Sequence, residues 1–136
     1  MLFRSFSVLV DGDDHNDPVA DAIRGTLDGH IVLDRRIAAQ GRYPAIDLGA
    51  SLSRLAHQVW TPEQRVLVGK MRDLIGRFED TRDLRAMGAY RAGSDADLDQ
   101  AVVMVPRIYE ALVQSPGTKP SEDAFRDLAN ALQKQR

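Results

Sequence analysis

The sequence of 136 residues has no cysteine, no long apolar run and no excess of charge of one sign. Without cysteine there can be neither a disulfide nor a thiolate-bound metal, which is compatible with a cytosolic protein. No uninterrupted apolar stretch approaches the roughly 20 residues of a membrane-spanning helix, so we expect no transmembrane segment. The formal net charge is −2, from 18 basic and 20 acidic residues. This balance argues against nucleic acid as a main partner, because a phosphate backbone attracts a broad positive field.

Several patterns that would indicate a complete catalytic site are also missing. The sequence contains no Gly-x-x-x-x-Gly-Lys-Ser/Thr loop for nucleotide phosphates and no Gly-x-Ser-x-Gly nucleophile elbow. Its histidines are too scattered to predict a metal site. The acidic run 11–17 differs from a calcium-binding EF-hand loop, because Asn16 and Ala22 stand where glycine and glutamate are needed. We favour an exposed turn that caps the following helix.

The first 60 residues read as an α/β segment. Apolar and polar residues alternate over 6–10, which predicts a strand, and 30–33 is a second strand candidate. Residues 19–27 and 35–40 have the spacing of short helices. Two strands make only a marginal sheet, so we expect further strands from a segment upstream of this sequence.

From Thr61 the pattern becomes helical. Thr61, Pro62 and Gln64 form a capping-box signature, which predicts the start of a long helix with one apolar face. A second helix should begin after the cap at 94–97 and be kinked by Pro106, and a third should follow the cap at 121–123. We therefore predict two domains, an α/β part at residues 1–60 and a small helical bundle at 61–136.

One short segment carries the best candidates for a functional site. Tyr43 stands before Pro44 in a rigid turn, and Arg54 follows two small hydroxyl residues in Ser-Leu-Ser-Arg. A nucleotide site shared between two subunits would require such an aromatic ring and such an arginine. Taken alone, the residues leave two alternatives open: Tyr43 could pack against Pro44, and Arg54 could be a solvated surface residue.

Four segments, at residues 10–21, 27–35, 43–47 and 88–95, occur in an order and spacing that resemble one family. They are similar to the C-terminal third of the flagellar and type III secretion export ATPases, relatives of the α and β subunits of rotary ATP synthases. The resemblance runs from Phe6 to about residue 112. It implies that residues 1–60 are the last strands and turns of a RecA-like nucleotide-binding domain without its phosphate-binding loop, and that 61–136 are its helical C-terminal domain.

The resemblance also implies roles for single residues. Arg54 matches the arginine finger that reaches across a subunit boundary to the γ-phosphate of the neighbour's ATP. Tyr43 matches the tyrosine that lines the adenine pocket of its own subunit. Asp13, Asp14 and Asp17 match a loop that contacts the central stalk in the rotary relatives. ATP and Mg²⁺ would be bound mainly by segments that this chain lacks, and the chain holds no metal site of its own.

The function implied is that of a cytoplasmic homohexamer, peripheral at the membrane export gate, which hydrolyses ATP to energise export of substrates delivered by chaperones. The chain alone is expected to be inactive. Residues 1–5 do not resemble the family, which suggests a truncated or artificially started reading frame. Two alternatives remain: a non-catalytic helical interaction module derived from this family, or an F-type or V-type ATPase subunit fragment. The latter is disfavoured by the sequences at 28–30 and 88–90, which look more like the export enzymes.

Overall fold

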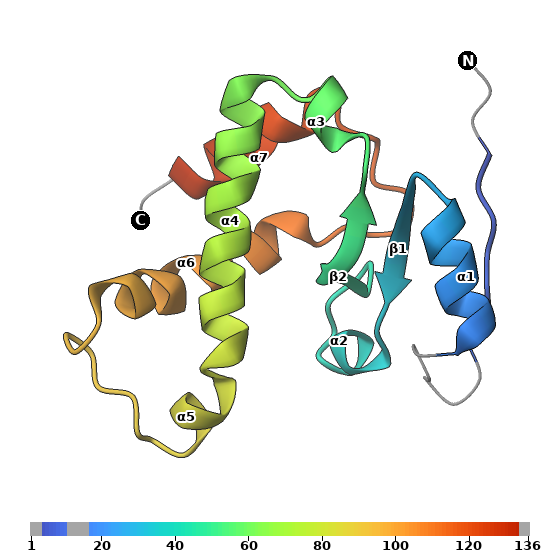
Figure 1. Cartoon of the computed structure of the whole chain (residues 1–136). Helices are drawn as coiled ribbons and strands as arrows, with labels where there is room; N and C mark the ends of the chain where they lie inside the picture. The colour runs from blue at the N-terminus through green and yellow to red at the C-terminus, as the bar shows by residue number, and fades with distance from the viewer. Residues whose placement is uncertain (1–3, 11–16, 134–136) are drawn as a thin grey trace.

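The computed structural model describes residues 4–10 and 17–133. In this part of the chain a small antiparallel sheet lies beside a group of helices, with the long helix α4 next to the sheet (Figure 1). In chain order the elements are α1 (Pro18–Thr26), β1 (Gly29–Leu33), α2 (Arg35–Ala39), β2 (Ile46–Ser53), α3 (Ala56–Val59), α4 (Pro62–Asp80), α5 (Arg82–Ala86), α6 (Ala96–Leu112) and α7 (Ala124–Gln133).

The prediction of a strand at residues 6–10 is wrong. Residues 4–10 form no strand, and the side chains of Phe6 and Leu9 are 68% and 98% exposed. A strand forms only when a neighbour satisfies its backbone groups, and in the described residues the sheet consists of β1 paired with β2. Residues 6–10 thus have the alternating pattern of a strand but, among the described residues, no neighbouring strand with which to pair.

The two strands pair around a large irregularity. Gly29 pairs with Ser53 and Leu33 with Ile46, but the pairing is interrupted opposite Ile31. In the interruption, the Asp47 carboxylate accepts hydrogen bonds from the amides of Gly49 and Ala50, at 2.8 and 2.9 Å. The prediction of β1 is confirmed. Strand β2 was not predicted, because hydrogen bonds to the Asp47 side chain take the place of regular strand pairing in part of it.

The predicted helices are present, and α1, α4 and α6 begin at the expected caps. The kink expected at Pro106 stays a prediction. At the start of α4, the amide of Gln64 donates to Thr61 Oγ1 (3.3 Å) and the amide of Thr61 donates to Gln64 Oε1 (3.0 Å), which completes the capping box. Asp95 caps α6, which continues through Pro106 to Leu112. The short helices α3 and α5 were not predicted.

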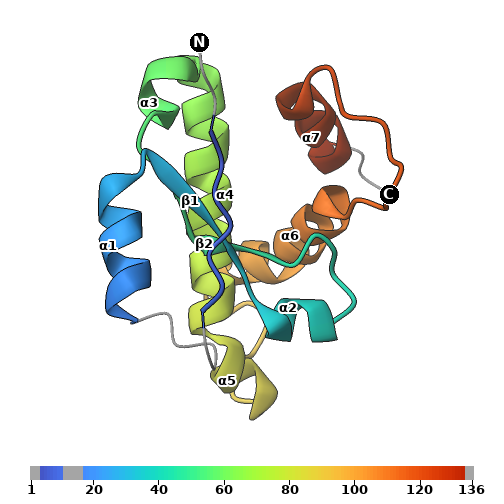
Figure 2. The same cartoon turned by 90° about the vertical axis from the view of Figure 1, so that its right-hand side faces the viewer.

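The hydrophobic core lies where α6 packs between α4 and α7 (Figure 2). Ala101, Val105 and Ile108 of α6 are completely buried, and Met71 and Ile75 of α4 complete this buried cluster. The predicted helical bundle is thus confirmed. Leu48 of β2 also packs against the cluster, so the irregular part of the sheet is attached to the helices.

The chain as a whole exposes more surface than a compact protein of its size. The accessible area is 10758 Å², whereas a compact monomer of 15.1 kDa is expected to expose about 7,000 Å². On β1, the side chains of Ile31 and Leu33 are 71% and 66% exposed. The sheet therefore presents an uncovered apolar face.

Candidate functional site

Strand β2 separates the two residues that the sequence singles out. Tyr43 precedes the strand, near the point where the Asp34 amide donates to the Ala45 carbonyl oxygen at 2.9 Å. Arg54 follows the strand, and its amide donates to the carbonyl oxygen of Asp28 at 2.8 Å. Asp28 and Asp34 flank β1 on either side, so the two places are roughly 20 Å apart at the usual rise per residue of a strand. Tyr43 and Arg54 therefore cannot contact one compact ligand group.

The Arg54 guanidinium is exposed and oriented by helix α1. Its Nε donates to the carbonyl oxygen of Leu27 and its Nη2 to that of Arg24, both at 3.3 Å. These carbonyl groups belong to the end of α1, where helix carbonyls lack partners within the helix and carry partial negative charge. Among the described residues no carboxylate forms an ion pair with Arg54. Its charge is therefore held in place and remains available to an external anion.

Tyr43 lies at the edge of a cavity of about 120 Å³. Its side chain is 54% exposed, the Tyr43–Pro44 peptide bond is cis, and its carbonyl oxygen accepts a hydrogen bond of 2.9 Å from the amide of Gln114. The cavity is lined mainly by apolar groups of α2, β2 and the end of α6, including Ile37, Leu48 and Leu112. A half-exposed aromatic ring beside an apolar cavity can receive a flat, partly apolar group.

Next to Tyr43, a set of contacts joins the turn to two helices. The Arg42 guanidinium carbon lies 3.8 Å from the centroid of the Tyr109 ring on α6, and the Tyr109 hydroxyl donates to Glu79 Oε1 of α4 at 2.6 Å. Burial and the hydrogen bond to Glu79 raise the pKa of Tyr109 to about 12, although Arg42 acts in the opposite direction. Sequence patterns did not predict this set, since only the place of Arg42 beside Tyr43 pointed to it.

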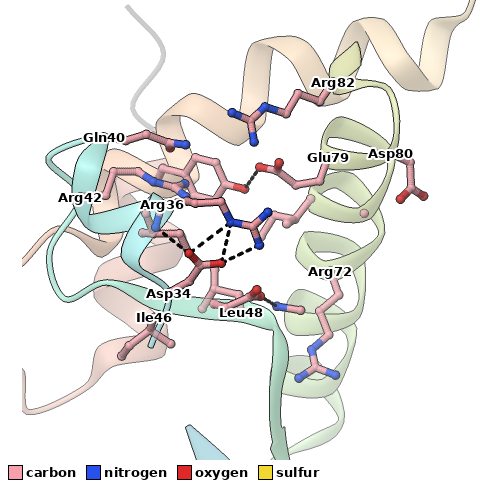
Figure 3. Close-up of a pocket in the computed structure, with 16 residues that line it drawn as sticks. Asp34, Arg36, Gln40, Arg42, Ile46, Leu48, Arg72, Glu79, Asp80 and Arg82 are labelled. Atoms are coloured by element: carbon pink, nitrogen blue, oxygen red, sulfur yellow. Dashed lines mark hydrogen bonds and ion pairs between the residues drawn. The ribbon is translucent and has the colours of Figure 1, made fainter. Parts of the chain in front are cut away.

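A larger cavity of about 510 Å³ lies between α2, β2 and α4 (Figure 3). Its walls carry both charge signs, and the Arg36 side chain that borders it pairs with Asp34 at 2.9 Å. Arg72 of α4 donates to the carbonyl oxygen of Ser51 at 3.2 Å. Glu79 points into this cavity, where it meets the Tyr109 hydroxyl. The cavity is thus lined by charged groups of both signs, and the Arg72 bond ties α4 directly to β2.

Of the acidic run 11–17, the structure describes only Asp17. Asp13 and Asp14 lie outside the described residues. Asp17 is the N-cap of α1, and its Oδ1 accepts hydrogen bonds from the amides of Val19 and Ala20 at 2.9 and 3.0 Å. The prediction that this run caps a helix is confirmed for Asp17.

Residues 4–10 and 17–133 contain no group of three or more histidine or acidic side chains arranged to hold a metal ion. Within the same ranges, none of the helices combines the length and the apolar character needed to cross a membrane.

Comparison with known proteins gives two adjacent family matches. Residues 4–53 match the nucleotide-binding domain of the ATP synthase alpha/beta family. Residues 60–134 match the C-terminal domain of the T3SS EscN ATPase. These matches together cover almost all of the described residues.

Single relatives agree with these matches. The flagellum-specific ATP synthase of Rhizobium meliloti is 63% identical over 126 residues, which are 93% of this chain and 27% of that protein. The assembled ATPase EscN from the type III secretion system of enteropathogenic E. coli superimposes with a TM-score of 0.83 at 35% identity, over 92% of this chain and 31% of that one. EscN in complex with its central stalk EscO gives a TM-score of 0.76 at 34% identity, over 85% and 29%. The chain thus spans about a quarter of the length of the Rhizobium meliloti protein.

Proposed function

Because the chain belongs to the family of flagellar and type III secretion ATPases, we propose that it is the C-terminal part of a subunit in a ring that hydrolyses ATP to energise protein export. Residues 1–60 end the nucleotide-binding domain and 61–136 form the helical domain. The two family matches, which end at residue 53 and begin again at residue 60, support this division.

Arg54 acts as an arginine finger on the ATP of the neighbouring subunit. The single observation that carries this role is its geometry: the guanidinium is exposed and fixed by the Leu27 and Arg24 carbonyl groups, without a carboxylate partner among the described residues. A positive charge placed in this way can stabilise the negative charge that develops on the transferred phosphoryl group. Arg54 and Tyr43 lie at opposite ends of β2, which suits contacts with two different nucleotides.

Tyr43 contributes to the adenine pocket of its own subunit. Support comes from its half-exposed ring beside an apolar cavity, because aromatic side chains favour stacking with flat rings. The nucleotide is ATP with Mg²⁺. Since the described residues contain no metal-binding cluster, we assign no Mg²⁺ ligand to them and derive no step through the ion.

The partners follow from the family. The subunit forms a homohexamer at the cytoplasmic face of the membrane, where it meets export chaperones, their substrates and the export gate. Structures of EscN include the assembled ATPase and its complex with the central stalk EscO. The acidic segment with Asp13, Asp14 and Asp17 contacts the stalk, and the cap made by Asp17 fixes the end of this segment to α1.

Two other functions are less well supported. An F-type or V-type subunit is disfavoured, because residues 60–134 match the T3SS EscN ATPase C-terminal domain. A non-catalytic interaction module would keep the fold but make no use of Arg54. The interaction module differs from the proposed ATPase subunit in one measurable property, the dependence of ATP hydrolysis on Arg54.

The test uses a chimaera in which this chain replaces the matching 27% of the Rhizobium meliloti protein. Arg54→Ala should lower kcat by about 10³-fold or more while nucleotide binding is retained. The matched control is Arg65→Ala, because Arg65 is also exposed and also donates to a carbonyl oxygen, that of His57 at 3.3 Å. Equal turnover of the two variants would exclude the finger and favour the interaction module.

A further inference from the structure

Arg42 is half-buried and is held against an aromatic ring. Its guanidinium carbon is 3.8 Å from the centre of the Tyr109 ring. The Nε atom of Arg42 is buried and has no hydrogen-bond partner among the described residues. Attraction between a cation and an aromatic face is stronger when the cation is desolvated. The ring of Tyr109 is therefore a major contact that fixes Arg42.

The opposite end of the same ring is held by a carboxylate. The Tyr109 hydroxyl donates to Glu79 Oε1 at 2.6 Å, which is in the range of strong bonds to ionised groups. Such a bond shifts electron density from the hydroxyl into the ring and so strengthens its attraction for a cation. Glu79 of α4, Tyr109 of α6 and Arg42 before β2 thus act as one unit, here called the Glu79–Tyr109–Arg42 relay.

The residue that follows Arg42 is tied to the same helix. The carbonyl oxygen of Tyr43 accepts a hydrogen bond of 2.9 Å from the amide of Gln114, which lies just beyond the end of α6. Two successive residues of the turn are therefore fixed to one helix end, one by its side chain and one by its backbone. If the ring of Tyr109 moves, Arg42 moves, and the backbone that carries the Tyr43 side chain must follow.

We propose that Glu79, Tyr109 and Arg42 are positioning residues that place the Tyr43 ring for contact with the adenine base and so determine the affinity for ATP. This inference rests on the role proposed for Tyr43. The base contact is made before and during the reaction alike, so its loss should raise KM more than it lowers kcat. Arg54, by contrast, is expected to affect kcat.

The kinetic test uses the same chimaera. Tyr109→Phe keeps the ring and removes the bond to Glu79, and should raise the KM for ATP about threefold to tenfold with kcat within about twofold, as expected for one lost hydrogen bond. Tyr90→Phe is the matched control, because the Tyr90 hydroxyl also donates to a carboxylate, that of Asp99, away from Tyr43. Arg42→Met should raise KM like Tyr109→Phe, and Arg42→Lys should restore part of the affinity because it keeps the charge.

The second readout does not depend on activity. Amide hydrogen exchange at Gln114 should be faster in Tyr109→Phe and in Glu79→Gln than in the parent or in Tyr90→Phe. Unchanged exchange at Gln114 would overturn the relay, and so would an unchanged KM in a chimaera whose kcat depends on Arg54. A chimaera whose turnover does not depend on Arg54 would instead refute the proposed function, and exchange at Gln114 would still decide whether the relay positions Tyr43.

Discussion

The amide of Gln114, just beyond α6, donates a hydrogen bond of 2.9 Å to the carbonyl oxygen of Tyr43, in the turn before β2. This bond joins the helical part of the chain to the part that matches a nucleotide-binding domain. Together with the contact of Leu48 to the helical core, it means that the helices can transmit a change of position to Tyr43. The arrangement offers a direct physical link between the helical domain and the proposed base contact.

The pKa of Tyr109 leads to a prediction at alkaline pH. Burial and the bond to Glu79 raise this pKa from 10 to about 12 in the folded chain. A raised pKa means that the folded state holds the proton more tightly, so the contribution of Tyr109 to stability is complete below pH 10 and is lost as the pH approaches 12. Tyr109→Phe should therefore show a shallower loss of unfolding free energy between pH 10 and 12, measured by urea denaturation. Parallel curves for the two proteins would contradict this prediction.

The capping box at Thr61 should contribute measurably to stability. Thr61→Ala removes the acceptor for the Gln64 amide and should lower the unfolding free energy by about 1 kcal/mol. The control is Thr26→Ala, because Thr26 Oγ1 only donates to the Ala22 carbonyl oxygen within the last turn of α1, a bond of small or unfavourable effect. Chemical denaturation followed by circular dichroism compares the two, and an equal loss in both would mean that the cap has no special role.

Local signals in the sequence predicted much of the fold. The residues that begin α4 and α6 act on their own neighbours, so Thr61 with Gln64 and Asp95 could be recognised without knowledge of the fold. The strand at 6–10 was predicted wrongly because a strand depends on a partner that local pattern does not reveal. Strand β2 was missed for a related reason, since the Asp47 side chain replaces part of its regular pairing.

In the candidate site, too, local features could be predicted from the sequence and long-range contacts could not. Tyr43 and Arg54 were found from short motifs and from resemblance to a family. The Glu79–Tyr109–Arg42 relay could not be found in this way, because Glu79 and Tyr109 are 30 positions apart and meet only when α4 packs on α6. The contact of Arg42 with the Tyr109 ring likewise depends on how the turn is placed against α6. Positioning residues of this kind require the three-dimensional structure.

The buried face of α6 provides a further test of the packing. Ile108 is completely buried, so Ile108→Ala should leave a cavity and lower the unfolding free energy by about 2 to 5 kcal/mol. Val103 lies on the same helix with 55% of its side chain exposed, and Val103→Ala should change the unfolding free energy by less than about 0.5 kcal/mol. Thermal and urea unfolding of both variants would measure the difference. Similar losses would show that α6 packs with a different face.

The proposed action of Arg54 between subunits can be distinguished from action within one subunit by mixing two inactive chimaeras. One carries Arg54→Ala, and the other lacks the lysine of the phosphate-binding loop in the part contributed by the Rhizobium meliloti protein. If Arg54 serves the neighbour, some interfaces in the mixed ring pair an intact phosphate-binding loop with an intact Arg54, so hydrolysis should reappear on mixing. Because each subunit has one defect, an arginine that acts only within its own subunit could restore nothing. Mixing Arg54→Ala with a chimaera that carries both defects is the control, and hydrolysis should stay absent there.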